Sequence, residues 1–267
     1  MRRVWVFLLP LVLLVLWSSV VGAQASAAAA EPLPYPDCRD VPWQMPPPIW
    51  QARLQAAARA YIADTPAKAQ RLARRLRFTR FPSPSNMCGP LTLAILRTAG
   101  LVPPTTPLRA FWLLNPRLEE HVIRRVLPPT RFCHSHFSQP LDQFDFRAFP
   151  LAPGDVLYLY AGRWDTFEHV LVVDRVDEQG RAYAVTNLNL AAEGVYVVRE
   201  VLLYDPQRPG IGQISVWTDR EHAADIGVTG HGGFDLWRPL WGAFAAKQPR
   251  RWLALRPRTR RAFPFPR

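Results

Sequence analysis

The spacing of hydrophobic residues in the first half of the chain predicts helices. Apolar residues recur at helical spacing in two segments, first at Trp50, Leu54, Ala57 and Tyr61, then at Ala69, Leu72, Ala73 and Leu76. The second segment follows Thr65–Pro66, a helix cap with proline in the first turn. A third helix is expected from about Cys88 to Ala99, with Gly100 ending it. Short helical pieces are expected between residues 107 and 127.

From residue 151 onward the pattern predicts strands. Segments 155–160, 168–176, 181–187 and 195–204 are rich in valine, leucine and tyrosine and are separated by turn residues. A last strand is expected to contain Trp237. Helices grouped ahead of an antiparallel run of strands predict an α+β domain.

A predicted hairpin turn at Gly180 sets the pairing register of the two strands on either side of it. If Gly180 takes the left-handed position of a three-residue loop, counting back along the two strands places Asn187 opposite Leu171 and Asn189 opposite His169. Both amides would then share a face with the histidine.

The ends of the chain differ from its middle. Residues 1–25 hold two arginines, an apolar run and small residues, which predicts a secretory signal peptide. The run is also long enough to serve as an uncleaved signal anchor. We therefore expect a secreted or extracytoplasmic protein, membrane-anchored if the signal is retained. Residues 26–48 form a proline-rich lead-in, and 49–246 the folded domain.

The formal net charge of +12 is concentrated at the C-terminus. Residues 247–267 carry eight positive charges and no acid, so the remaining body is close to neutral. A solvated, disordered tail is one interpretation, and electrostatic contact with anionic wall polymer or a membrane surface is the other. Nucleic acid is not expected as a partner.

Cys88 is the candidate nucleophile. At the first turn of a helix its sulfur would face unpaired backbone amides and the positive end of the helix dipole, which favour the thiolate. Its own amide could donate to an oxyanion, with Asn86 or Ser85 as side-chain helpers. A buried structural cysteine that happens to begin a helix is the alternative.

The cysteine count bears on that choice. If two of the three cysteines of an exported chain form a disulfide, the third remains a free thiol. Cys38, in the lead-in, and Cys133, in the loop before the strands, could form a bridge and leave Cys88 free. All three could equally be reduced.

His169 is the candidate base, because it opens a strand that could lean toward the N-terminus of a helix packed on the sheet. Either Asn187 or Asn189 could accept a ring proton and hold the imidazole in its working tautomer.

These segments resemble a known superfamily. Residues 88–96, beginning Cys-Gly-Pro, are similar to the nucleophile helix of bacteriocin-processing-like cysteine peptidases. Residues 151–156 and 168–170 resemble the strand pair of NlpC-type and CHAP cell-wall hydrolases. The resemblance implies a papain-like fold and a peptidase or amidase acting on peptide bonds, often those of peptidoglycan. It assigns Cys88, His169 and Asn187 as the triad.

Two other functions remain open. The bacteriocin-processing-like group has a glutamine before the cysteine, whereas none occurs here between Gln70 and Cys88. A catalytically inactive surface or wall-binding module is therefore an alternative, and a papain-like enzyme with other acyl chemistry is a third.

Residues 133–136 read Cys-His-Ser-His, which offers three potential metal ligands. A tetrahedral zinc site needs ligands from a second segment, and the sequence shows none. We therefore expect neither a metal ion nor a cofactor.

Overall fold

The computed structural model describes residues 33–161, 167–190, 195–218 and 230–245. All of these except Leu33 belong to one compact unit that begins at Pro34. The predicted signal peptide and the predicted basic tail lie outside the described residues. No helix in the described ranges has the length and hydrophobicity needed to span a bilayer.

The predicted helices are confirmed. They are α1 (Pro48–Arg59), α2 (Pro66–Leu76) and α3 (Cys88–Ala99), followed by the short pieces η2 (Leu108–Phe111) and α4 (Glu120–Val126). The remaining helical segments are η1 (Pro84–Asn86), α5 (Gln213–Thr218) and α7 (Trp241–Ala245). Thr65 caps α2 by accepting from the backbone N–H of Lys68 at 3.3 Å. Gly100 ends α3 with φ of 87°, a left-handed value that favours glycine.

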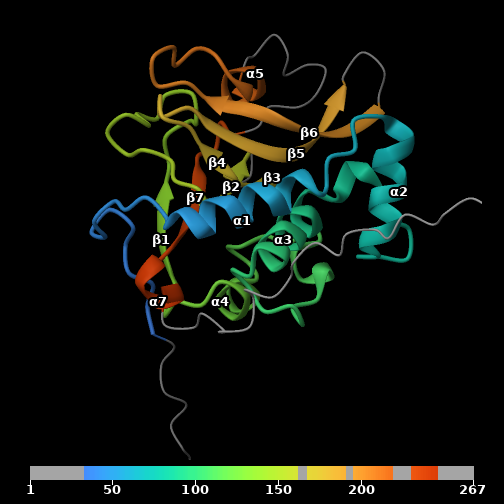
Figure 1. The fold of residues 1–267 in the computed structure, drawn as a ribbon, viewed down its shortest axis with the longest axis horizontal. Helices are drawn as coiled ribbons and strands as arrows, with labels where there is room; N and C mark the ends of the chain where they lie inside the picture. Colours follow the sequence, from blue (N-terminus) through green and yellow to red (C-terminus); the bar gives the residue numbers. More distant parts are fainter. Residues whose placement is uncertain (1–32, 162–166, 191–194, 219–229, 246–267) are drawn as a thin grey trace, which may run out of the picture. The chain divides into compact units, whose positions relative to one another are not determined.

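The strands form two antiparallel sheets, which confirms the α+β class (Figure 1). They are β1 (Phe132–Phe137), β2 (Val156–Tyr160), β3 (Phe167–Val172), β4 (Arg175–Val176), β5 (Ala182–Leu190), β6 (Val195–Tyr204) and β7 (Phe234–Pro239). One sheet has the order β1-β7-β2-β3 and the other β4-β5-β6. The expected strand around Trp237 is β7. Strand β1 was not expected, because its segment was predicted to be a loop.

The predicted hairpin turn is present. Gly180 has φ of 77°, and the backbone N–H of Asp177 donates to Arg181 O at 3.1 Å. The predicted register holds for β4, where Arg175 and Val176 lie opposite Tyr183 and Ala182. It is wrong farther from the turn, since β3 pairs with β2 and β5 also pairs with β6. Asn187 consequently lies opposite Val198 instead of a residue of β3.

The four-stranded sheet separates two hydrophobic cores. Because side chains alternate along a strand, Val156 and Tyr158 of β2 enter the core beneath α1, α2 and α3. Leu157 and Leu159 enter the second core, which is shared with the three-stranded sheet and α5. Figure 1 shows α1, α3 and α4 on one side and β5, β6 and α5 on the other. A side chain's position along a strand therefore decides which core it joins.

Part of the lead-in belongs to the folded unit. Cys38 and Cys133 form a disulfide, which confirms that pairing, and Cys88 is the free cysteine of the three. The bridge ties the lead-in to β1, where the backbone N–H of His134 donates to Pro36 O at 2.9 Å. The domain boundary expected at residue 49 thus lies after residues that already pack on the sheet.

Candidate functional site

Cys88 begins α3 as predicted, but its side chain is enclosed by the first core and is 7% exposed. Burial raises the pKa of the thiol to about 11, because desolvation outweighs the opposing effect of the backbone N–H groups of Val170 and Gly89. The thiol is therefore protonated at neutral pH, and the expected thiolate does not form.

Gly89 has a packing role in the Cys-Gly-Pro sequence. A Cβ atom built at this position would lie 1.8 Å from the carbonyl oxygen of Phe111. Because η2 approaches α3 so closely, only glycine fits there. The glycine of the Cys-Gly-Pro motif that suggested a nucleophile helix is thus explained by close contact between two backbones.

His169 lies in a different environment. Its Nε2 is 2.7 Å from Thr186 Oγ1, and its ring lies 4.9 Å from that of Trp217. Burial lowers the pKa of the imidazole to about 4. His169 is accordingly a neutral, packed side chain whose contacts are with the second core.

The register of β2 and β3 separates the predicted catalytic pair. Val170 lies opposite Tyr158 and enters the first core together with Cys88, whereas His169 lies opposite Leu159 of the second core. Cys88 and His169 are therefore on opposite faces of the four-stranded sheet. No hydrogen bond links them, and the predicted Cys-His couple is not assembled.

The predicted orienter also has another role. Asn187 donates from Nδ2 to Pro84 O at 2.9 Å and so holds the turn that precedes Cys88. Its Oδ1, like that of Asn189, is buried without a hydrogen bond in the described part of the chain. The side chain hydrogen-bonded to the His169 ring is that of Thr186, one position earlier on β5.

A buried carboxyl group lies where the two sheets diverge. Asp174 is 1% exposed, and neither carboxyl oxygen accepts a hydrogen bond of standard geometry from the described residues, although the backbone N–H of Val185 is close enough to interact. Burial and the nearby Glu200 raise the pKa of Asp174 to about 7, against the opposing effects of the Val185 backbone N–H and of the charges of Arg175 and Arg59. In the native state this residue therefore holds its proton far more tightly than an unfolded chain does.

That difference predicts a pH-dependent stability. Between about pH 4 and pH 7 the native state binds the extra proton, so the free energy of unfolding should fall as pH rises and level off above pH 7. Asp174→Asn should remove this fall and be more stable than the parent at pH 8 by about 1–3 kcal/mol. Urea midpoints at pH 5 and pH 8 measure it, with exposed Asp142→Asn as the control. Equal pH dependence in parent and Asp174→Asn would contradict the prediction.

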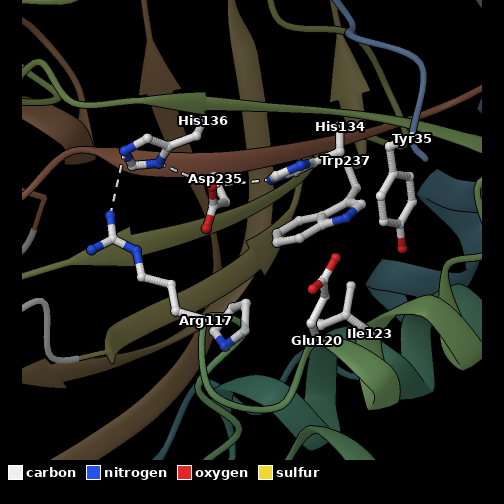
Figure 2. A pocket seen from close by; sticks show the side chains of 9 residues that line it. Tyr35, Arg117, Glu120, Ile123, His134, His136, Asp235 and Trp237 are labelled. Atoms are coloured by element: carbon white, nitrogen blue, oxygen red, sulfur yellow. Dashed lines mark hydrogen bonds and ion pairs between the residues drawn. The ribbon is translucent and has the colours of Figure 1, made fainter. Parts of the chain in front are cut away.

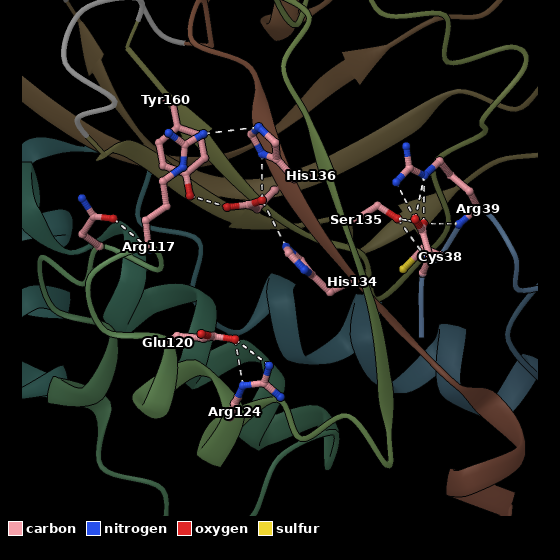
Figure 3. A network of polar contacts seen from close by, with 12 residues as sticks. Cys38, Arg39, Arg117, Glu120, Arg124, His134, Ser135, His136 and Tyr160 are labelled. Atoms are coloured by element: carbon pink, nitrogen blue, oxygen red, sulfur yellow. Dashed lines mark hydrogen bonds and ion pairs between the residues drawn. The ribbon is translucent and has the colours of Figure 1, made fainter. Parts of the chain in front are cut away.

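A second cluster of titratable side chains surrounds Asp235 (Figure 2). His134 and His136 project from β1, two residues apart on one face, toward Asp235 on the neighbouring strand β7. His134 Nε2 and His136 Nδ1 lie 3.1 and 3.0 Å from the same carboxylate oxygen. The hydroxyl of Tyr160 donates to the other oxygen. Figure 3 shows this network continuing through Arg117.

The charge of Asp235 fixes how the rings are protonated. Burial alone would raise its pKa, but the hydrogen bonds from His134 and Tyr160 hold the pKa below its usual range. An ionised carboxylate only accepts, so His134 carries its proton on Nε2 and His136 on Nδ1. Arg117 Nη2 lies 3.4 Å from Nε2 of His136, which must then accept. Nδ1 of His134 forms no hydrogen bond with the described residues and is the available proton acceptor.

The cluster borders a cavity of about 230 Å³ between the β1-β7 strands and α4. Tyr35 and Trp237 supply aromatic walls, Glu120 lies on the α4 side, and Arg117 reaches in from the preceding loop (Figure 2). His134 stacks on Trp237 at 4.5 Å between ring centres. An oriented base, a cation and a small recess are therefore found together.

Sequence reasoning noticed these histidines only as potential metal ligands. The second segment that it could not identify is β7, whose Asp235 lies about 100 positions away and reaches them through strand pairing. The His-x-His spacing was the available signal, because alternate residues of a strand share a face. Among the described residues no group of three His, Cys, Asp or Glu side chains is arranged to hold a metal ion.

Comparisons of the chain with protein-family models, curated proteins and solved structures find no match. The resemblance to papain-like peptidases consequently rests on the short motifs alone. The chemistry of the site has to be inferred from its own geometry.

Proposed function

We propose that the protein is a hydrolase in which His134 acts as a general base on water, with no role for the Cys88 thiol in catalysis. The observation that supports this is the hydrogen bond from His134 Nε2 to the buried carboxylate of Asp235, which orients a ring that lines the cavity and leaves Nδ1 without a proton. In the serine hydrolase triad the aspartate accepts from Nδ1 and Nε2 is the base, so the two ring nitrogens of His134 would exchange those roles here.

The proposed step is attack of water on an ester or amide carbonyl. Nδ1 of His134 takes a proton from water as the oxygen bonds to the carbonyl carbon, and Asp235 stabilises the imidazolium. The guanidinium of Arg117, at the cavity wall, is placed to stabilise the oxyanion. The imidazolium then returns its proton to the leaving oxygen or nitrogen as the carbonyl re-forms, so the imidazole is regenerated.

We retain the expected substrate class and location within this proposal. A peptide or peptidoglycan amide, an exported protein and a papain-like ancestry are compatible with a helix beginning at Cys88 followed by antiparallel strands. The Cys-His couple of that family would then be out of use here, and the site would have moved to β1 and β7.

Replacing His134 provides the test. We expect His134→Ala to lower the rate of 4-nitrophenyl acetate hydrolysis by about 100-fold or to the background, the usual effect of losing a general base. His121→Ala, an exposed histidine of α4, is the matched control and should be unchanged. Cys88→Ser should retain activity. Loss of activity in Cys88→Ser with activity kept in His134→Ala would overturn the proposal in favour of a thiol enzyme.

A second candidate is a binding module without turnover. It is favoured by the absence of serine, threonine or cysteine among the described side chains that line the cavity, and by the saturation of Asp235 with three donors. In that case no probe ester is hydrolysed, and a muropeptide should quench tryptophan fluorescence in the parent but not in His134→Ala. Hydrolysis above the His134→Ala background would rule this candidate out.

A further inference from the structure

The body of the chain is close to neutral, but its positive and negative charges lie in different parts of the sequence. Residues 41–118, which contain α1, α2 and α3, carry eleven lysines and arginines but one acid, Asp64. The following residues 119–245 carry seventeen acids and eleven basic residues. The helical layer is therefore electropositive independently of the C-terminal tail, and the strands compensate it.

Part of this charge lines a groove between α2 and α3. Two adjoining cavities, of about 580 and 330 Å³, share Ala60, Tyr61 and Arg75 and so form one continuous depression. Arg71 and Arg75 line it from α2, and Arg97 lines it from α3. No aspartate or glutamate belongs to either lining.

The arginines of this groove are not neutralised by the rest of the described structure. Arg71, Arg75 and Arg97 form no ion pair with a described carboxylate, whereas Lys68 at the edge pairs with Asp64 at 2.7 Å. Nε of Arg97 is buried and lacks a hydrogen-bond partner among the described residues. This donor is free to bond an acceptor that enters the groove, whether water or an anionic ligand.

The spacing indicates a repeating anion. Arg71 and Arg75 are one helical turn apart, so their stems are separated by about 6 Å along α2. Guanidinium groups at that interval suit consecutive phosphates of an extended chain, each bound in a bidentate manner. Tyr61 is the one aromatic side chain among the described residues that line the two cavities, and the guanidinium of Arg75 lies over its ring at 5.6 Å. The described lining therefore lacks the series of aromatic stacking surfaces typical of single-strand nucleic acid sites.

We infer that the groove between α2 and α3 binds a linear polyol phosphate or sugar phosphate polymer through Arg71, Arg75 and Arg97. A concave, acid-free lining distinguishes this site from a flat membrane-docking face, and a lining with one aromatic ring differs from the multiple stacking platforms of a single-strand nucleic acid site. The groove is separate from the His134 cavity, so this inference does not depend on the proposed hydrolase.

Binding of poly(glycerol phosphate) to the full chain, measured by isothermal titration at two salt concentrations, tests the inference. Arg71→Gln/Arg75→Gln should weaken binding at least tenfold and lower the slope of log affinity against log salt by about 1–2. Arg125→Gln/Arg147→Gln changes the net charge equally but lies outside the groove, and it should weaken binding less than threefold. Arg97→Gln alone should also weaken binding.

Three results would overturn the inference. Equal losses in the two double variants would show that only overall charge, including that of the tail, matters. Tighter binding to a single-stranded oligonucleotide, or to phosphatidylglycerol vesicles, would assign the groove to another partner. Circular dichroism spectra that match the parent confirm that each variant is folded.

Discussion

Replacing Arg238 with methionine is expected to lower the free energy of unfolding by about 3–5 kcal/mol. Arg238 on β7 is 4% exposed and donates to both oxygens of Asp155, which is fully buried, at 2.8 and 2.7 Å. The same guanidinium donates to Pro150 O at 2.7 Å. Without Arg238 the carboxylate of Asp155 is left buried without its counter-ion. The free energy cost of that buried charge is far larger than the stability that the ion pair itself contributes.

Urea unfolding measures this loss, and the exposed pair Lys68–Asp64 supplies the control. Lys68→Met should change stability by less than about 1 kcal/mol, because water screens that pair. The double variant Arg238→Met/Asp155→Leu should recover part of the loss, since no buried charge is left over. A loss below 1 kcal/mol for Arg238→Met alone would show that Asp155 finds another partner or water.

Removing the disulfide with Cys38→Ala/Cys133→Ala should cost about 4 kcal/mol. The bridge closes a loop across a sequence separation of 95 residues, so its loss restores much conformational freedom to the unfolded chain. The bridge also fixes Tyr35, a wall of the His134 cavity, whose hydroxyl donates to Leu127 O at 2.6 Å. The variant should therefore lose activity or ligand binding at temperatures where it is still folded.

Treatment with a reductant distinguishes the loss of the disulfide from the loss of side-chain packing that the two alanine substitutions cause. Dithiothreitol should lower the urea midpoint of the parent nearly to that of the double variant and leave the variant unchanged. If the parent and the variant unfold at the same midpoint without reductant, the bridge does not contribute to stability as expected.

The local elements could be predicted from the sequence because their signals lie within a few residues. Thr65 and Pro66 start α2, Gly100 ends α3, and Gly180 makes the hairpin turn. Each is a short-range preference of the backbone or of a capping side chain. Together they establish the α+β class and place Cys88 at the start of a helix.

The site could not be predicted in the same way. A shift of one position along a strand moves a side chain to the other face of the sheet, and the parity of β3 turns His169 away from Cys88. The predicted continuation of the hairpin fails at Asp174, where β3 and β5 enter different sheets. Nothing near these residues in the chain encodes that separation.

Sequence by itself thus determined where helices begin and end and where the chain turns, whereas the strand that puts His134 and His136 on one face was not predicted. Only the tertiary structure decided that Asp235 meets those histidines, and that Cys88 is desolvated and protonated. The physical reason is that strand pairing and burial depend on segments far apart in the chain, whereas caps and turns depend on neighbours.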